Sequence, residues 1–285
     1  MKENKTLAYK NQYPAVLILF ILTGCVALHR DQVQFDHLSD CPKQSDSKLA
    51  SLQNELGPMS DTQTLACAVD FMRNNKGTAL LRSALGRRLC LNLAERETDQ
   101  DKREKLAGEG VAFAEMALSK GGDDDGAVHY YLAANLGLAV REHLTLAMDN
   151  LNRLEGEMKK ALALSPGIDD GGPMRLLGAL YIKAPAWPNG IGDRDKGLDL
   201  LEQAVKKYPG HPLNHLFYAQ AILAVDDGDA PALAKSEFML GEKLLERGNW
   251  GHSRPSWKKE FDNFRDDITE ASGSPAQPLA MQTRR

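Results

Sequence analysis

The segment 171–219 constrains the fold more than any other part of the chain. Its apolar residues recur with helical spacing, which predicts two helices joined by a loop rich in Pro and Gly. Gly178 offers a small residue in the first helix, and Ala204 offers one in the second, five residues before Pro209. Because small residues let two helices cross closely and proline ends a helix, the segment predicts an antiparallel helix pair.

The same pattern occurs once more, earlier in the chain. Ala161 precedes Pro166 by five residues, and Pro166 precedes Pro209 by 43 residues. A minimal tetratricopeptide repeat, which is a pair of antiparallel helices, has about 34 residues, so this chain carries insertions. The Leu136-Gly137 pair indicates a third, degenerate copy. We therefore expect an all-α fold, an irregular tetratricopeptide-like right-handed helical solenoid with a concave face.

Helical patterns fill residues 61–271, the predicted helical-repeat domain. No stretch alternates apolar and polar residues as a half-buried strand does, and the low aromatic content of 6% also suits a helical protein. Residues 272–285, with Gly, Ser, Pro and Gln, are predicted to be disordered. The expected helices cover residues 62–74, 78–96, 100–119, 127–140, 144–164, 173–183, 194–208, 213–225, 230–247 and 256–271.

The first 24 residues have the pattern of an export signal. Three lysines precede an apolar run at 15–22, which is shorter than the roughly 20 residues that span a bilayer. The ending Leu22-Thr23-Gly24-Cys25 is similar to the bacterial lipobox, in which the cysteine is lipidated and becomes the new N-terminus. We expect residues 1–24 to be a lipoprotein signal peptide and Cys25 to carry the lipid. An ordinary signal peptide with a chance cysteine is the alternative.

The residues after the signal describe the mature product. Val26 follows Cys25 where an Asp would retain the protein at the inner membrane, which favours a periplasmic protein anchored to the outer membrane. Residues 25–60 are polar and are expected to form a tether. Removing three Lys and one Glu with the signal takes the formal charge from −4 to −6. This mildly acidic product argues against nucleic acid as a partner, and leaves the Cys25 lipid as the contact with the membrane.

Besides the lipid-bearing Cys25, the mature chain contains three cysteines, and an oxidising periplasm favours a disulfide between two of them. The pair Cys41–Cys67 is slightly preferred, because Cys41 has no helical context that would bury it. Cys67 and Cys90 lie on successive helices and form the alternative pair. A third interpretation keeps Cys67 and Cys90 as small buried apolar residues without a disulfide.

The loop before the second helix carries Trp187, for which two roles are open. The residue is either a plug on the hydrophobic core or an exposed anchor, and the plug is favoured because most aromatic side chains are buried. Asp193 is predicted to cap the helix that follows. The loop bends at several turn-forming residues, namely Pro185, Pro188, Asn189, Gly190 and Gly192.

Patterns of catalytic or metal-binding residues are weak. His211 and His215 have the spacing of two metal ligands, but Pro212 lies between them at a helix start and no Glu stands in a His-Glu-x-x-His arrangement. The acidic run 123–125 lacks the alternating ligands of a calcium loop. No Ser or Cys lies in a nucleophile elbow. We expect neither an enzyme nor a cofactor or metal site.

The residues of the repeat segment resemble a known family, the T component associated with TRAP-type transporters. The resemblance covers about residues 127–247 and implies a periplasmic lipoprotein of irregular tetratricopeptide helices. It further implies that the protein partners a periplasmic substrate-binding protein and passes a hydrophobic or organic-acid ligand. The motifs that carry it are Gly171-Gly172-Pro173-x-Arg175-x-Leu177-Gly178-x-Leu180-Tyr181, Ala184-Pro185-x-Trp187-Pro188-x-Gly190-Ile191-Gly192-Asp193 and Pro209 with Asn214-His215-Leu216-Phe217.

The expected function is therefore that of a protein-interaction or transport accessory. The alternative is a scaffold or assembly factor of the envelope that binds proteins in the solenoid groove, and the sequence leaves homo-oligomers open. First helices of such repeats line the concave face, and aromatic residues with a polar tip suit a ligand or partner surface there. The candidate residues are Tyr130, Tyr131, Asn135, Tyr181, Asn214, His215 and Tyr218, with Trp187 and Asn189 at the rim.

Overall fold

The computed structural model describes residues 28, 31–42, 51–52, 55–74, 79–225 and 230–273 of the 285-residue chain. The predicted signal peptide, the predicted lipidation site Cys25 and residues 274–285 of the predicted disordered tail lie outside these described residues. None of the helices in the described part of the chain is long and apolar enough to cross a bilayer.

The described residues form an all-helical fold without strands, as the sequence predicts. Every expected helix is present, with bounds that differ by at most two residues from the prediction. The helices are α2 (Thr62–Asn74), α3 (Ala79–Arg96), α4 (Gln100–Leu118), α5 (Gly126–Val140), α6 (Leu144–Leu164), α7 (Gly172–Lys183), α8 (Arg194–Lys207), α9 (Pro212–Val225), α10 (Ala230–Arg247) and α11 (Arg254–Gly273).

Side-chain caps fix where several helices begin. The carboxylates of Asp99, Asp125 and Asp193 each accept a backbone N–H of the first turn of α4, α5 and α8, at 2.9, 2.9 and 3.1 Å. These bonds satisfy donors that have no partner inside the helix. The predicted capping role of Asp193 is thus confirmed.

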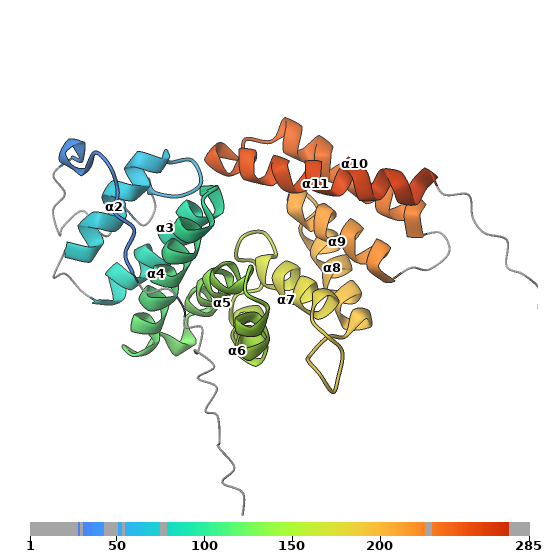
Figure 1. Ribbon diagram of the computed structural model, residues 1–285, viewed down its shortest axis with the longest axis horizontal. Coiled ribbons are helices and arrows are strands. Elements are labelled where there is room, and N and C mark those ends of the chain that lie inside the picture. The colour runs from blue at the N-terminus through green and yellow to red at the C-terminus, as the bar shows by residue number, and fades with distance from the viewer. Residues whose placement is uncertain are drawn as a thin grey trace, which may run out of the picture.

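The helices pack in chain order, and the row curves back on itself. Each helix from α2 to α11 contacts the next one, and α10 and α11 lie across the top of Figure 1, where they return toward α2 and α3. The two ends of the row touch. The backbone N–H of His252 donates to the carbonyl oxygen of Pro58 at 2.9 Å, and Arg96 donates to the carbonyl oxygens of Pro58 and Ser60. The described helices therefore form a closed ring.

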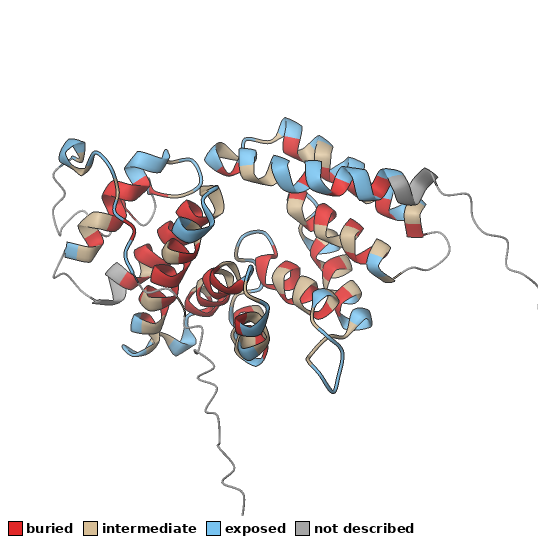
Figure 2. Ribbon diagram, in the orientation of Figure 1, coloured by how far each residue is buried: buried red, intermediate tan, exposed pale blue. Residues whose placement is uncertain are grey.

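Apolar side chains between neighbouring helices hold the ring together. Figure 2 shows buried residues along most of the helices, and three main clusters of them lie between α2 and α5, between α4 and α7, and between α9 and α11. The close crossing predicted at Gly178 is present, because a Cβ there would lie 2.7 Å from Leu201 of α8. Ala161 and Ala204, the small residues of the sequence pattern, are fully buried.

The N-terminal segment 31–42 lies against the helices, so the expectation of a tether over residues 25–60 is wrong for this part. Val33 is buried, and Phe35 packs against the cluster between α2 and α5. The guanidinium of Arg73 donates to the carbonyl oxygen of Val33 at 2.9 Å and lies 4.6 Å from the ring centroid of Phe35. The buried side chain of Val33 and the partly buried ring of Phe35 hold the segment against the helices.

A disulfide adds a covalent link between this segment and α2. Cys41 and Cys67 are joined with an S–S distance of 1.94 Å, which is the pairing that the sequence slightly prefers. Cys90 is a free, fully buried thiol in α3, and burial raises its pKa well above the ordinary value. The alternative pair Cys67–Cys90 is not formed.

Candidate functional site

A group of polar and aromatic side chains gathers where α3, α5 and α7 approach the middle of the ring. The connection between α6 and α7, residues 165–171, lies in this middle region (Figure 1). It carries Asp169, whose charge acts on the groups around it. We call the group the central polar cluster, and its members are Glu95, Tyr130, Tyr131, Asp169 and Arg175.

Asp169 joins α5 to α7 and, through Arg175, to α9. Its carboxylate accepts hydrogen bonds from the hydroxyl of Tyr130 in α5, at 2.8 Å, and from the guanidinium of Arg175 in α7. Arg175 also donates to the side-chain oxygen of Asn214 in α9, at 2.7 Å. The Arg175 side chain is 2% exposed, whereas that of Asp169 is 40% exposed. Asp169 therefore neutralises a buried arginine and still reaches water.

The backbone of the α6–α7 connection has an unusual conformation. Asp169 and Asp170 have φ values of 51° and 46°, and Gly171 follows with 87°. Asp is among the few residues other than Gly that adopt left-handed backbone, and Gly adopts it without strain. Tyr208 packs so closely on Gly171 that a Cβ would lie 2.6 Å from its ring. The sequence Asp-Asp-Gly thus allows the turn that brings Asp169 toward Tyr130 and Arg175.

Glu95 stands at the end of α3 and is half-buried. Within the described residues its carboxylate has no hydrogen-bond partner. Burial, followed by the negative charge of Asp169, raises the pKa of Glu95 to about 7, against the opposing effect of Arg175 and Arg96. A carboxyl group with this pKa exchanges its proton near neutral pH, and its oxygens are available to a hydrogen-bond donor.

Tyr131 is the second member of the cluster with unused hydrogen-bonding capacity. Its ring is half-buried, packs edge-on against Tyr130 at a centroid distance of 5.1 Å, and lies beside the guanidinium of Arg87. In the part of the chain that is described, its hydroxyl bonds to no other group. Burial, followed by the charge of Asp169, raises the pKa of Tyr131 to about 12, so the hydroxyl stays protonated.

The substitution Glu95→Gln is expected to change how stability depends on pH. The folded chain holds a proton on Glu95 up to pH about 7, whereas the unfolded chain loses it near the ordinary value of 4.5. Wild-type stability therefore falls as the pH rises through this window, and Gln avoids the fall. Urea unfolding should find the two proteins equal at pH 4 and the variant more stable by about 2 kcal/mol at pH 8, with allowance for partial exposure. If the free energies of unfolding of the two proteins differed by the same amount at both pH values, the raised pKa of Glu95 would be contradicted.

The structure brings only two of the nine predicted surface residues, Tyr130 and Tyr131, into the central polar cluster. Asn135 and Asn214 are fully buried, and their amide groups donate to backbone carbonyl oxygens. The hydroxyl of Tyr181 donates to Glu155, and His215 contacts Glu237, each at 2.7 Å. These side chains hold neighbouring helices together, so their predicted place on an accessible surface is wrong.

The remaining predicted residues lie elsewhere. Tyr218 is half-buried in the cluster between α9 and α11. Asn189 is exposed, and Trp187 is 85% exposed, which contradicts the interpretation of Trp187 as a core plug. The loop of Trp187 follows the C-terminus of α7, whereas Asp169 precedes its N-terminus. A helix of 12 residues is about 18 Å long, so Trp187 does not belong to the central polar cluster.

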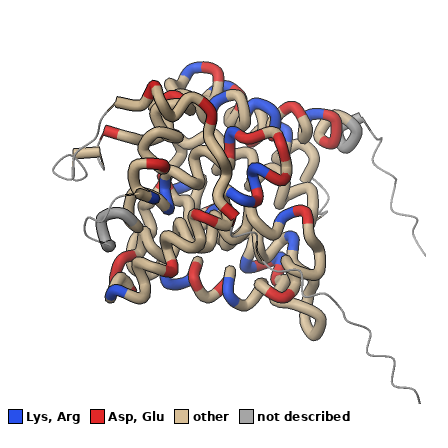
Figure 3. The backbone as a smooth tube through the Cα atoms, turned by 60° about the vertical axis from the view of Figure 1, so that its left-hand side comes forward, with Lys and Arg blue, Asp and Glu red and all other residues tan. Residues whose placement is uncertain are grey.

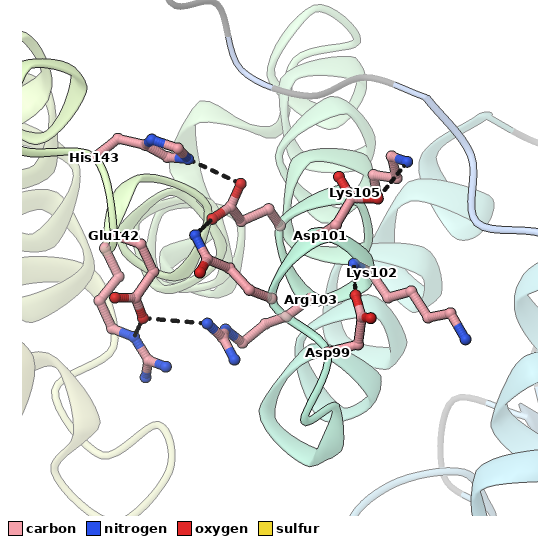
Figure 4. Close-up of polar contacts among 10 residues, drawn as sticks. Asp99, Asp101, Lys102, Arg103, Lys105, Glu142 and His143 are labelled. Carbon is pink, nitrogen blue, oxygen red and sulfur yellow. Dashed lines mark hydrogen bonds and ion pairs between the residues drawn. The ribbon is translucent and has the colours of Figure 1, made fainter.

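A second group of polar side chains joins α4 to the turn between α5 and α6 (Figure 4). His143 contacts Glu104 at 2.9 Å, and Arg103 pairs with Glu142 at 3.1 Å. Because these side chains contact one another, the group fixes the α5–α6 turn. In the described residues no three His, Cys, Asp or Glu side chains are placed to hold a metal ion. His211, one of the two histidines with metal-like spacing, packs instead against the rings of Trp250 and Trp257.

Three members of the cluster, Glu95, Asp169 and Arg175, were not predicted as site residues. The run Asp169-Asp170-Gly171 was the only local signal, since two acidic residues before a glycine favour a tight turn. No protein-family model matches the chain, and no curated protein matches its sequence. The resemblance to the T component of TRAP-type transporters stays a prediction.

Proposed function

We propose that the protein is a lipid-anchored helical-repeat accessory of the bacterial envelope. In this proposal Cys25 carries the lipid, tetratricopeptide-like helix pairs form the body, and the body partners a periplasmic substrate-binding protein in TRAP-type uptake of a small organic ligand. The lipobox-like sequence at 22–25 and the resemblance over residues 127–247 support the location and the class of partner. The observation that carries the proposal is a contact that recurs in alternate helices.

This contact is made by the fourth residue of α5, α7 and α9. His129, Arg175 and His215 hold that position, and each contacts the carbonyl oxygen of the residue six positions earlier, at 2.8, 3.3 and 2.9 Å. His129 and His215 also contact a carboxylate on the following helix, Glu157 and Glu237, at 2.6 and 2.7 Å. Equivalent contacts at equivalent positions support three copies of one helix-pair unit, which is the basis of a repeat scaffold.

The central polar cluster is the proposed ligand site of this scaffold. Among the described members of the cluster, Glu95 and Tyr131 have hydrogen-bonding capacity that no protein group uses, whereas Asp169 and Arg175 are paired. Glu95, once it has lost its proton, would repel a ligand that carries only negative charge, whereas the charge of Asp169 is balanced by Arg175. The cluster therefore favours an organic ligand that offers hydrogen-bond donors, such as hydroxyl or amine groups.

In-cell cross-linking of the tagged, full-length protein tests the function. The proposal predicts that a periplasmic substrate-binding protein is the main partner that mass spectrometry identifies, and that its ligand co-purifies with the wild type. Tyr131→Phe removes a hydroxyl without a partner, so ligand recovery should fall while the melting temperature stays the same. Tyr181→Phe is the matched control, because it removes the bond to Glu155 and should lower stability alone. Partners drawn only from outer-membrane, pilus or wall assembly would refute the transport role and support the envelope scaffold.

A further inference from the structure

The chain leaves little distance between the predicted lipid and the folded body. Leu28 is partly buried and packs against two apolar clusters, the one between α2 and α5 and the one between α4 and α7. Cys25 precedes Leu28 by three residues, which span at most about 11 Å in any conformation. A lipid on Cys25 would therefore hold the surface around Leu28 directly at the bilayer, without a tether in between.

The surface near Leu28 includes the turn between α5 and α6. The two clusters that Leu28 joins meet along α4, where Ala107 belongs to one and Val111 to the other, and at the C-terminal end of α5, where Ala139 belongs to one and Val140 to the other. Leu144 begins α6 directly after this turn and is 80% exposed. The contacts of Glu142 and His143 with α4 hold the turn in place (Figure 4). A large apolar side chain is thus presented to the outside next to the point where the anchor leaves the body.

The loop between α7 and α8 lies on the same side of the ring as the α5–α6 turn. Tyr130 at the start of α5 bonds to Asp169 and packs on Gly172, the first residue of α7. Because α5 and α7 both begin at this contact and both are followed by an antiparallel partner, their C-terminal ends lie on one side of the ring. The loop 184–193 leaves α7 at that end and projects from the bottom of the body in Figure 1.

This loop has the composition of a membrane-interface contact. Residues 184–192 contain no charged side chain, and the lowest part of the tube in Figure 3, which is this loop, is free of blue and red. Trp187 at its tip is 85% exposed, the highest value among the large apolar residues of the described chain, and Leu144 is second. Backbone bonds from Gly192 to Pro185, at 2.8 Å, and from Asn189 to Ala186, at 3.1 Å, fix the loop. Tryptophan is the residue that favours the boundary between lipid and water.

We infer that the edge formed by Leu28, Leu144 and the loop 184–193 lies flat on the lipid surface, with Trp187 at the level of the headgroups. The inference rests on the proposed lipidation of Cys25, since the short link from Cys25 to Leu28 selects a bilayer as the occupant of this edge. The ring then stands on the membrane with its α5–α6 and α7–α8 turns, and α10 and α11 lie on the side away from it (Figure 1).

Fluorescence quenching by brominated lipids tests the inference on the lipidated full-length chain. The protein is reconstituted into phosphatidylethanolamine and phosphatidylglycerol vesicles, with or without bromine near the glycerol end of the acyl chains. We expect the wild type to lose the emission of Trp187 in brominated vesicles and Trp187→Phe to lose none. The double variant Trp187→Phe with Met239→Trp is the control, because Met239 lies on α10 and is 58% exposed. Its added tryptophan should stay unquenched.

The outcomes separate the inference from the function on which it rests. Acylated protein that sediments with the vesicles but shows no quenching of Trp187 would overturn the inference and leave the lipid anchor intact. Unquenched Trp187 together with loss of the cross-linked partner in Trp187→Phe would assign the loop to a protein instead. Purified protein without an acyl group at Cys25 would refute the proposed anchor, and with it the reason for placing this edge on lipid.

Discussion

Replacing Glu109 with alanine is expected to lower the free energy of unfolding by about 3–5 kcal/mol. Glu109 of α4 pairs with Arg73 of α2 through two hydrogen bonds of 2.7 Å each, and both side chains are less than a tenth exposed, at 6% and 7%. Without Glu109 a buried guanidinium keeps its charge but loses its counterion. The removal of Glu109 also loosens the segment that contains Val33, because Arg73 donates a hydrogen bond to the carbonyl oxygen of Val33.

Urea unfolding of the mature chain measures this effect against two further variants. Asp262→Ala breaks an exposed ion pair with Lys258 and should change stability by no more than about 0.5 kcal/mol. The double variant Arg73→Met with Glu109→Leu replaces both charges by apolar groups and should regain most of the lost stability. If Glu109→Ala were as stable as Asp262→Ala, the pair would not be the buried link between α2 and α4.

The helices could be predicted from the sequence because their signals are local. Spacing of apolar residues, a capping carboxylate such as Asp193 and helix-ending prolines such as Pro166 all act within one or two turns. The small residues Gly178 and Ala204 could also be placed at buried helix crossings: a Cβ at Gly178 would lie 2.7 Å from Leu201, and Ala204 is fully buried. Each of these features depends on neighbours in the chain and not on the course of the whole ring.

The candidate site depends on contacts between distant residues. Glu95 and Asp169 are 74 positions apart, and they come close because the row of helices curves, which no local pattern expresses. Conversely, Asn135 and His215 have the polar character of surface residues but find partners on neighbouring helices and are buried. Trp187 was expected in the core on general preference, yet the turn-forming residues around it hold it away from the helices.

Cys25→Ala is expected to abolish membrane attachment. The proposed lipid is the only anchor in the account, and one tryptophan with one leucine at the surface buries too little apolar area to hold the chain on a bilayer. After fractionation, the variant should appear in the soluble part of the envelope, whereas the wild type sediments with outer membranes. A variant that remains fully membrane-bound would contradict the role of Cys25.

Mass spectrometry of the N-terminal peptide tests the central claim, a lipid-anchored envelope protein, most directly. The mature wild-type protein, extracted with detergent from cells that express its gene naturally, is digested and its first peptide is identified. The account predicts a peptide that begins at Cys25 and carries the mass of a diacylglycerol group with an added acyl chain. A peptide that begins at any other residue, or at an unmodified Cys25, would contradict the account.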